Sequence, residues 1–249
     1  MGRKRKKVRG HSRYFFYWLI AAIVLYFAVS KVIIISRNID FFNVKRIEIT
    51  GNKYLSQDFL LSVSQSYINQ NIFDVNSKEI ETLYDNIIRV KNVNCRKVFP
   101  SSLKISITER VGVFFIRNVK GEFFPIDKDR TVLDKADSYL KEDLPFLNLS
   151  FSVEKLLPGQ IVEDKKLDYV FMVYDELLNS QPNIISDISE FYFRDNVLHF
   201  VDIESGSRVI IGMDEIASQI KRFLFLRQNH GFEKQSLVDL RFPNQIIVR

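Results

Sequence analysis

The sequence contains very little cysteine and histidine. Cys95 is the single cysteine among 249 residues, so the chain cannot form an internal disulfide bond. The three histidines, His11, His199 and His230, are far apart in the sequence, and no cysteine–histidine spacing is typical of a metal site. We therefore expect no bound metal and no cofactor, and we expect Cys95 to be a small buried side chain in the core.

Proline and glycine are also scarce, and the common catalytic motifs are missing. Six prolines and nine glycines are too few for a fibrous or linker-rich protein. The sequence contains no Gly-x-Ser-x-Gly, no His-Glu-x-x-His, no Cys-x-x-Cys and no glycine-rich loop that would hold a phosphate. We expect no catalytic residue and no small-molecule substrate. A membrane-tethered enzyme whose site is visible only in three dimensions is left as an alternative.

Positive charge is concentrated at the N-terminus. The first 13 residues contain seven lysines and arginines and no acidic residue, whereas the whole chain has a net charge of +6. Removing these seven from the 36 basic residues leaves 29, against 30 acidic residues. The chain after this tail has no excess of positive charge for a phosphate backbone, and we expect no nucleic-acid partner.

One long apolar run follows the tail. Residues Tyr14 to Ile35 contain a single charge, Lys31. As a helix, this run is about 33 Å long, which is enough to cross a hydrocarbon core of about 30 Å. Tyr17 and Trp18 lie near its start, where aromatic rings favour the membrane interface. We therefore expect a transmembrane helix whose ends are Tyr14 and Ile35.

The basic tail predicts the orientation of this helix. Positively charged flanks stay in the cytoplasm, so residues 1–13 are expected inside and the chain after Arg37 outside. The alternative is a cleaved signal peptide with a site near Ala28-Val29-Ser30, but the apolar run continues past that site from Val32 to Ile35. We expect a single-pass membrane protein with its folded part beyond the membrane.

Residues 38–110 show the pattern of a compact domain with the element order β-α-α-β-β. An alternating strand at 44–50 ends at the turn Gly51-Asn52. Two helices and two further strands follow, at 56–67, from Asn76, at 92–99 and at 103–109. The second helix is expected to place one apolar face against the sheet, formed by Ile80, Leu83, Tyr84, Ile87 and Ile88.

Residues 111–249 predict a strand-rich domain with flanking helices, which makes the fold class α+β. Hairpin strands at 112–126 precede a helix at 167–178, and three strands at 188–211 precede a helix that begins near Asp214. The last strands are expected at 236–242 and 245–249. Three acidic residues follow the hairpin, and we expect a solvated loop there: Asp127, Asp129 and Asp134.

Short motifs occur in a characteristic order along these two domains. In the first domain they are Val44-x-x-Ile47-x-Ile49-x-Gly51-Asn52, Leu55-Ser56, Val90-Lys91-Asn92-Val93, Arg96-x-x-Phe99-Pro100-x-x-Leu103-x-Ile105 and Thr108-Glu109-Arg110. In the second domain they are Leu144-Pro145-x-Leu147, Val209-x-Ile211-Gly212 and Val238-Asp239-Leu240-Arg241-Phe242. With the apolar span before them, they resemble the bacterial division family FtsQ/DivIB, whose outer part is a POTRA domain followed by a β domain. The resemblance covers nearly the whole chain.

The resemblance implies an organisation and a function. It divides the chain into a cytoplasmic tail (1–13), a transmembrane helix (14–35), a POTRA domain (38–110) and a β domain (111–249). It implies a non-enzymatic assembly protein of the divisome in the inner (cytoplasmic) membrane at the division septum, with its N-terminus cytoplasmic and its domains periplasmic. Such a protein recruits and links the periplasmic parts of other division proteins.

The resemblance also implies where a partner binds. In FtsQ-like proteins the last strand docks an FtsB-type partner, so FtsB/FtsL-like (DivIC-like) proteins are the expected partners. Arg241 would offer its guanidinium to a carboxylate and Phe242 would be an apolar anchor. The expected partner-binding residues are Arg241, Phe242, Asn244, Gln245, Ile246, Ile247 and Val248. An ordinary closing strand is the plain structural alternative, and a POTRA protein of envelope transport or assembly is the functional one.

Overall fold

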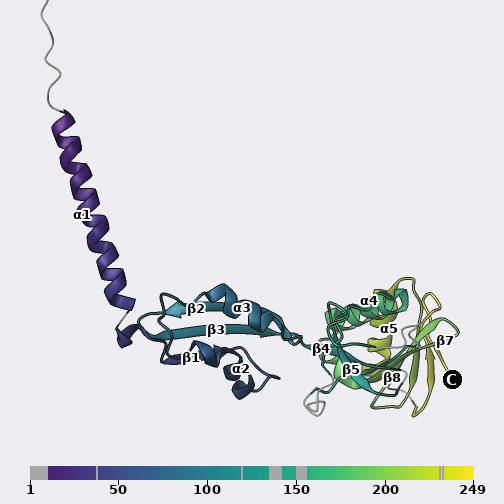
Figure 1. The fold of residues 1–249 in the computed structure, drawn as a ribbon. Coiled ribbons are helices and arrows are strands. Elements are labelled where there is room, and N and C mark those ends of the chain that lie inside the picture. Colours follow the sequence, from purple (N-terminus) through teal and green to yellow (C-terminus); the bar gives the residue numbers. More distant parts are fainter. Residues whose placement is uncertain are drawn as a thin grey trace, which may run out of the picture. The chain divides into compact units, whose positions relative to one another are not determined.

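The computed structural model describes residues 11–37, 39–118, 120–134, 142–149, 156–229, 231 and 233–249 (Figure 1). These residues belong to two compact units. The first unit contains the chain up to Gly51 together with Ser56–Tyr84 and Val93–Ile107. The second unit contains Asn52–Leu55, Asp85–Asn92 and Thr108–Arg249. The ten residues at the start of the predicted basic tail and His230 lie outside the described residues.

Helix α1 (His11–Arg37) includes both expected ends of the membrane span, Tyr14 and Ile35. Its stretch from Tyr14 to Lys31 has a mean hydropathy of 1.6 and is not buried by other parts of the chain. This helix is long and apolar enough to cross a membrane.

The first domain of the chain has the predicted element order. Its elements are η1 (Asp40–Phe42), β1 (Arg46–Thr50), α2 (Gln57–Ser64), η2 (Gln65–Tyr67), α3 (Ser77–Asp85), β2 (Val90–Val98) and β3 (Ser102–Glu109). The strands form one sheet in the order β1-β3-β2, and β1 runs parallel to β3 with Ile47 opposite Leu103 and Ile49 opposite Ile105. The predicted β-α-α-β-β order is therefore confirmed.

The core of this domain contains Ile80 and Tyr84 of α3, both fully buried. The Tyr84 hydroxyl donates a hydrogen bond to the carbonyl of Leu60 in α2 at 2.7 Å, so the two helices share a buried polar contact. The prediction for Leu83 was wrong, because this side chain is 40% exposed. Helix α3 ends at Asp85, so Ile87 is not helical and the apolar face is narrower than expected. Cys95 is buried as predicted.

Two of the motifs in this part of the chain have a clear structural role. Gly51 has a positive φ of 92°, and a Cβ atom there would collide with the carbonyl oxygen of Ile107. The buried Glu109 carboxylate accepts hydrogen bonds from the backbone N–H groups of the following loop, at 2.9, 2.7 and 2.9 Å, from Lys53, Tyr54 and Leu55. The Gly-Asn turn and the Thr-Glu-Arg motif thus fix local backbone geometry.

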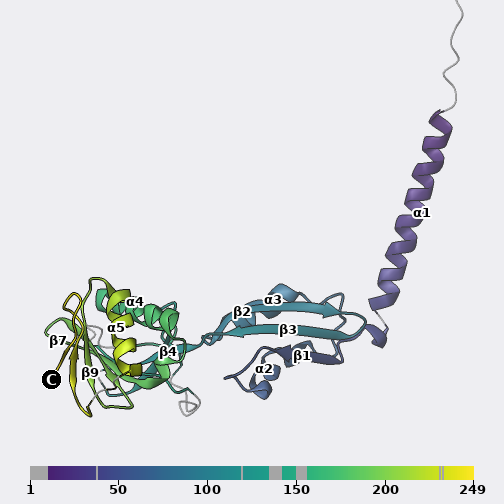
Figure 2. The same ribbon diagram turned by 180° about the vertical axis from the view of Figure 1, so that it is seen from behind.

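The rest of the chain forms a large sheet with helices on one face (Figures 1 and 2). Its elements are β4 (Gly112–Arg117), β5 (Phe123–Asp127), β6 (Phe146–Asn148), α4 (Lys165–Ser180), η4 (Ile184–Asp187), β7 (Ile188–Arg194), β8 (Val197–Asp202), β9 (Arg208–Ile211), α5 (Ile216–Asn229), β10 (Leu237–Asp239) and β11 (Ile247–Val248). The eight strands lie in the order β11-β10-β9-β8-β7-β6-β4-β5.

Alternating residues of these strands form the core with the two helices. The Phe114 ring of β4 contacts Phe171 of α4 at 5.4 Å, and Phe200 of β8 contacts Phe223 of α5 at 5.2 Å between ring centroids. Phe191 of β7 joins the two groups, with its ring 5.5 Å from Phe114 and 5.9 Å from Phe200. Both helices therefore cover the same face, and the fold class is α+β as predicted.

Candidate partner-binding site at the edge of the sheet

The two edge strands of the large sheet, β5 and β11, differ in whether another segment of the chain covers their outer side. The outer side of β5 is covered by the segment that follows it: Leu133 N–H donates to Pro125 O at 2.8 Å, and Asp127 N–H donates to Thr131 O at 3.1 Å. Within the described residues, β11 has a neighbour on one side only, β10. An uncovered edge strand presents backbone groups that another strand can pair with.

The pairing of β11 fixes which of its backbone groups face outward. Leu237 and Arg249 exchange two hydrogen bonds, of 2.8 and 3.0 Å, and Ile247 is opposite Asp239. Opposite residues in an antiparallel pair alternate between bonded and non-bonded. Ile247 therefore turns its N–H toward β10, whereas the N–H and C=O of Val248 point away from the sheet.

The expected strand over 245–249 is shorter in the structure. Only Ile247 and Val248 are assigned to β11, and the residues before them form a turn in which Asn244 has a positive φ of 58°. Phe242, Asn244 and Gln245 are exposed, and Ile246 packs partly against the core. The expected partner-binding residues thus form an exposed turn followed by an edge strand.

A groove of about 360 Å³ lies beside this edge, on the face of the sheet that carries no helix in the described residues. Successive side chains of a strand point to opposite faces of the sheet. The residues that alternate with core residues therefore line this groove. Its lining comes from the four strands β7, β8, β9 and β10 and from two residues outside them: Tyr192, Arg194, Asp195, Val197, His199, Arg208, Ile210, Leu237 and Arg241.

Arg241 lies in this groove but already has a carboxylate partner. Its Nε and Nη2 donate to the two oxygens of Asp239, at 2.9 and 2.6 Å. These hydrogen bonds lower the pKa of Asp239 and raise the pKa of Arg241. The Arg241 side chain is 43% exposed, and the pairing leaves only its remaining N–H donors for an external group.

Two other arginines in the groove have no such partner. Among the described residues, neither Arg194 of β7 nor Arg208 of β9 forms an ion pair, and both side chains are exposed. Their positive charges are therefore available to a ligand. The sequence analysis did not single them out, although their polar character at positions that alternate with core residues was a usable signal.

His199 forms the floor of the groove. It is 7% exposed and stacks on Tyr192 with ring centroids 5.0 Å apart. Burial lowers the pKa of this imidazole, and the charges of Arg194 and Arg241 lower it further. Its Nδ1 atom is buried, with no hydrogen-bond partner among the described residues. The ring therefore packs as a buried part of the sheet.

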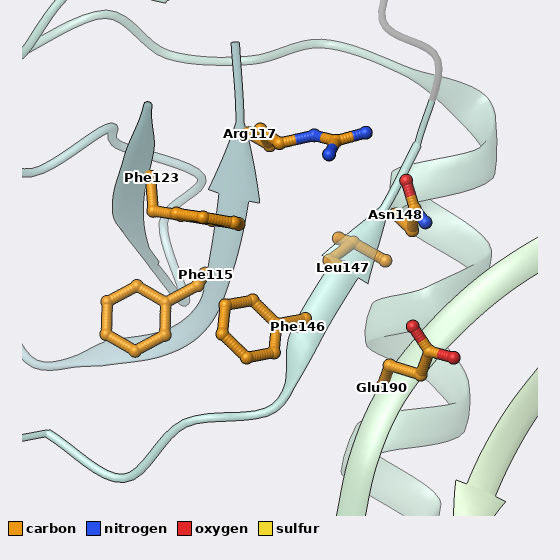
Figure 3. A pocket seen from close by; sticks show the side chains of 7 residues that line it. All are labelled: Phe115, Arg117, Phe123, Phe146, Leu147, Asn148 and Glu190. Carbon is orange, nitrogen blue, oxygen red and sulfur yellow. The ribbon is translucent and has the colours of Figure 1, made fainter. Parts of the chain in front are cut away.

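A second hollow, of about 190 Å³, lies near the other end of the same sheet (Figure 3). Its rings come from three adjacent strands: Phe146 is 5.7 Å from Phe115 and 5.1 Å from Phe123 between centroids. Arg117 and Glu190 complete its polar rim (Figure 3). This end of the sheet is aromatic, whereas the β11 end is rich in arginine.

The acidic loop after the hairpin is not uniformly solvated, which corrects the sequence-based expectation. Asp127 is 3% exposed and accepts a hydrogen bond from Arg110 at 2.7 Å and from the N–H of Thr131 at 2.8 Å. Asp129 is exposed and pairs with Lys91 at 2.7 Å, and that contact lowers its pKa. These carboxylates hold the segment that covers β5.

Comparison with known proteins agrees with the motifs. Residues 42–110 match the family described as POTRA domain, FtsQ-type. The cell division protein DivIB of Clostridium acetobutylicum is 27% identical over 167 residues, which cover 66% of this chain and 60% of that protein. The cell division protein FtsQ of Syntrophotalea carbinolica is 22% identical over 213 residues, which cover 84% and 74% of the two chains.

A third relative is more similar over a shorter stretch. The DivIB of Clostridium botulinum strain Hall is 31% identical over 114 residues, which cover 45% of this chain and 44% of that protein. The alignments thus span between about half and three quarters of these relatives. The matched POTRA domain, the relatives' names and the α+β fold all support the FtsQ/DivIB family of cell division proteins.

Proposed function

We propose that this protein is a non-enzymatic assembly protein of the divisome that links division proteins on the outer side of the cytoplasmic membrane. Helix α1 anchors it, with the basic tail in the cytoplasm and both folded units outside. It acts at the division septum, and its partners are FtsB/FtsL-like (DivIC-like) proteins. The observation that carries the proposal is the β11 edge, which is open among the described residues, beside a groove whose Arg194 and Arg208 form no ion pair with any of them.

The partner binds by adding a strand to β11. The outward N–H and C=O of Val248 supply backbone pairing, which tolerates many sequences. Phe242, Asn244, Gln245 and Ile246 lie just before the strand and contact the flank of the added segment. This role is consistent with their exposure or partial exposure in the free protein.

The groove provides the specificity of docking. Because side chains of an added strand alternate between the two faces of the sheet, every second one lies on the helix-free face. From this strand the partner chain continues across the groove, where its acidic side chains meet Arg208, two strands in from β11, and Arg194, four strands in; neither arginine forms an ion pair among the described residues. Arg241 contributes its remaining donors, since Asp239 occupies the others. We therefore infer that the main charge contact is with Arg194 and Arg208 and not with the expected Arg241.

Substitution at Val248 tests strand addition directly. Val248→Pro removes the outward N–H, whereas Val248→Ala keeps it and removes only the side chain. We expect the proline variant of the full-length protein to lose the partner in a pull-down and the alanine variant to retain it. Circular dichroism checks that both variants fold. Undiminished binding by a folded Val248→Pro variant would contradict the proposal.

Depletion in the native cell tests the biological role. Loss of an assembly protein of the division site gives filamentous cells, whereas loss of an envelope transport or assembly factor gives defects in envelope proteins. A complementing copy that carries Arg194→Glu and Arg208→Glu should fail to restore division even though it reaches the membrane. Full rescue by that copy would count against the groove as the docking site.

A further inference from the structure

Four phenylalanines form a continuous chain of ring contacts in the first unit. The centroid distances are 5.2 Å from Phe41 to Phe42, 5.2 Å from Phe42 to Phe73 and 5.4 Å from Phe73 to Phe99. We call this set the phenylalanine patch. Phe41 is 57% exposed, Phe73 40% and Phe99 56%. Large aromatic side chains that remain in contact with each other and with solvent indicate a surface that is covered in the cell.

The patch is a fixed part of the fold. It combines three segments that are far apart in the sequence: the stretch after α1, the loop before α3 and the turn between β2 and β3. Ile72 N–H donates to Phe42 O at 2.9 Å and Val44 N–H donates to Gln70 O at 2.8 Å, which joins the first two segments. Lys45 N–H donates to Ser101 O at 2.8 Å and joins the third.

Covalent connection places the patch close to the membrane. Helix α1 ends at Arg37, and Phe41 follows four residues later. Four residues span at most about 14 Å even when fully extended. The polar interface adds only about 5–8 Å to each side of the hydrocarbon core. If α1 spans the bilayer, Phe41 cannot be farther from the interface than this short connection allows.

Charge near the patch has both signs. Lys45 and Asp40 are exposed beside it, and Lys97 Nζ lies 3.5 Å from the carbonyl oxygen of Phe73. Aromatic rings flanked by mixed charges suit the zone between headgroups and acyl chains, where apolar area is buried and charges remain hydrated. Burial of the rings, and not attraction to anionic lipid, is the main source of affinity in such an arrangement.

We propose that the phenylalanine patch inserts into the headgroup–acyl interface on the outer side of the bilayer that α1 crosses, so that the first unit is held against the membrane surface. This inference rests on α1 as a membrane span and is independent of partner docking at β11. The occupant is lipid. Cover by a second protein or a second copy of this chain is the alternative that the experiment distinguishes.

Tryptophan fluorescence of the full-length protein tests the proposal. Trp18 is the single tryptophan, so Trp18→Phe gives a silent background. Phe99→Trp then places a probe in the patch, on a turn that is 62 positions after Arg37 in the sequence. Phe59→Trp is the matched control, because Phe59 is 46% exposed on α2 of the same unit and makes no ring contact with the patch among the described residues.

Each variant is placed as one copy per phosphatidylcholine nanodisc, with and without brominated acyl chains. We expect the Phe99→Trp probe to show blue-shifted emission that brominated lipid quenches, and the Phe59→Trp probe to show red-shifted emission with little quenching. Equal and weak quenching of the two probes would overturn the proposal. Blue-shifted but unquenched emission from Phe99→Trp would overturn it too, because protein would then cover the patch.

Discussion

Strands β5 and β11 are the two edge strands of one sheet. The chain covers the outer side of β5, whereas no described residue covers the outer side of β11. Residues 131–133 run along the outer side of β5 and pair with it through backbone hydrogen bonds. Along β11 no described residue does so. The open face beside β5 gathers Phe115, Phe123 and Phe146, whereas the open face beside β11 gathers arginines.

The contrast distinguishes an edge strand that the protein covers with its own chain from an edge strand that can still pair with a strand of another protein. A covered edge removes the risk of unwanted strand pairing, and natural sheets commonly cover or charge their edges for that reason. Buried Asp127 and its partner Arg110 hold the cover on β5. Arg194 and Arg208 lie on the helix-free face that leads in from the other edge and form no ion pair among the described residues, and in the proposed function their charges select an acidic partner.

Both ends of the sheet depend on the same core, and loss of that core should give the largest effect. Phe191 is fully buried at the centre of the sheet. We expect Phe191→Ala to lower the free energy of unfolding by about 3–5 kcal/mol, measured by urea denaturation. Phe225→Ala is the control, because this ring is exposed on α5 and its loss should change stability by about 0.5 kcal/mol or less. Similar effects of the two substitutions would mean that the core is misassigned.

Charge reversal should lower the affinity for the partner when it is made at the arginine-rich end of the sheet but not when it is made at the aromatic end. The double substitution Arg194→Glu and Arg208→Glu is expected to weaken partner binding by about 1–3 kcal/mol, or about 5- to 150-fold, with unchanged stability. Arg117→Glu at the aromatic end should change the affinity by less than about 0.5 kcal/mol. Titration calorimetry at two salt concentrations measures both, and salt should weaken wild-type binding. An equal loss for Arg117→Glu would remove the contrast between the ends.

The Arg241–Asp239 pair should give the smallest effect. Arg241 is partly exposed, so solvent screening limits the pair to about 1 kcal/mol of stability. Because the pKa of Asp239 is lowered in the folded protein, this contribution is complete above the unfolded pKa of about 3.9 and is lost as the pH falls through the folded value. The stability difference between wild type and Asp239→Asn should therefore shrink in acid. A difference that grows as the pH falls would contradict this assignment.

The sequence predicted the elements of the fold better than their limits. Alternation identified the strands around Leu103 and Val209, because each has one face in a core. It extended the last strand too far, since Pro243-Asn244 forms a turn before β11. It also placed Leu83 inside, because a helical period does not show how wide the buried face of α3 is.

The candidate site was predictable only in part. The motif that ends in Arg241 and Phe242 pointed to the edge of the sheet that is open among the described residues, where we propose that the partner docks. Arg194 and Arg208 were missed because they lie on strands β7 and β9, and only the register of the folded sheet brings them into one groove. The partner of Arg241 was missed as well, although Asp239 is two residues away on the same face.

Hydrogen exchange at single-residue resolution tests strand addition to β11 most directly. In the free protein the Val248 amide should exchange fast because it points outward, while the Ile247 amide is protected by β10. On addition of the proposed FtsB-like partner, the account predicts new protection at Val248 and no change along β5, from Phe123 to Asp127. Protection that appears along β5, or a Val248 amide that still exchanges fast in the complex, would contradict it.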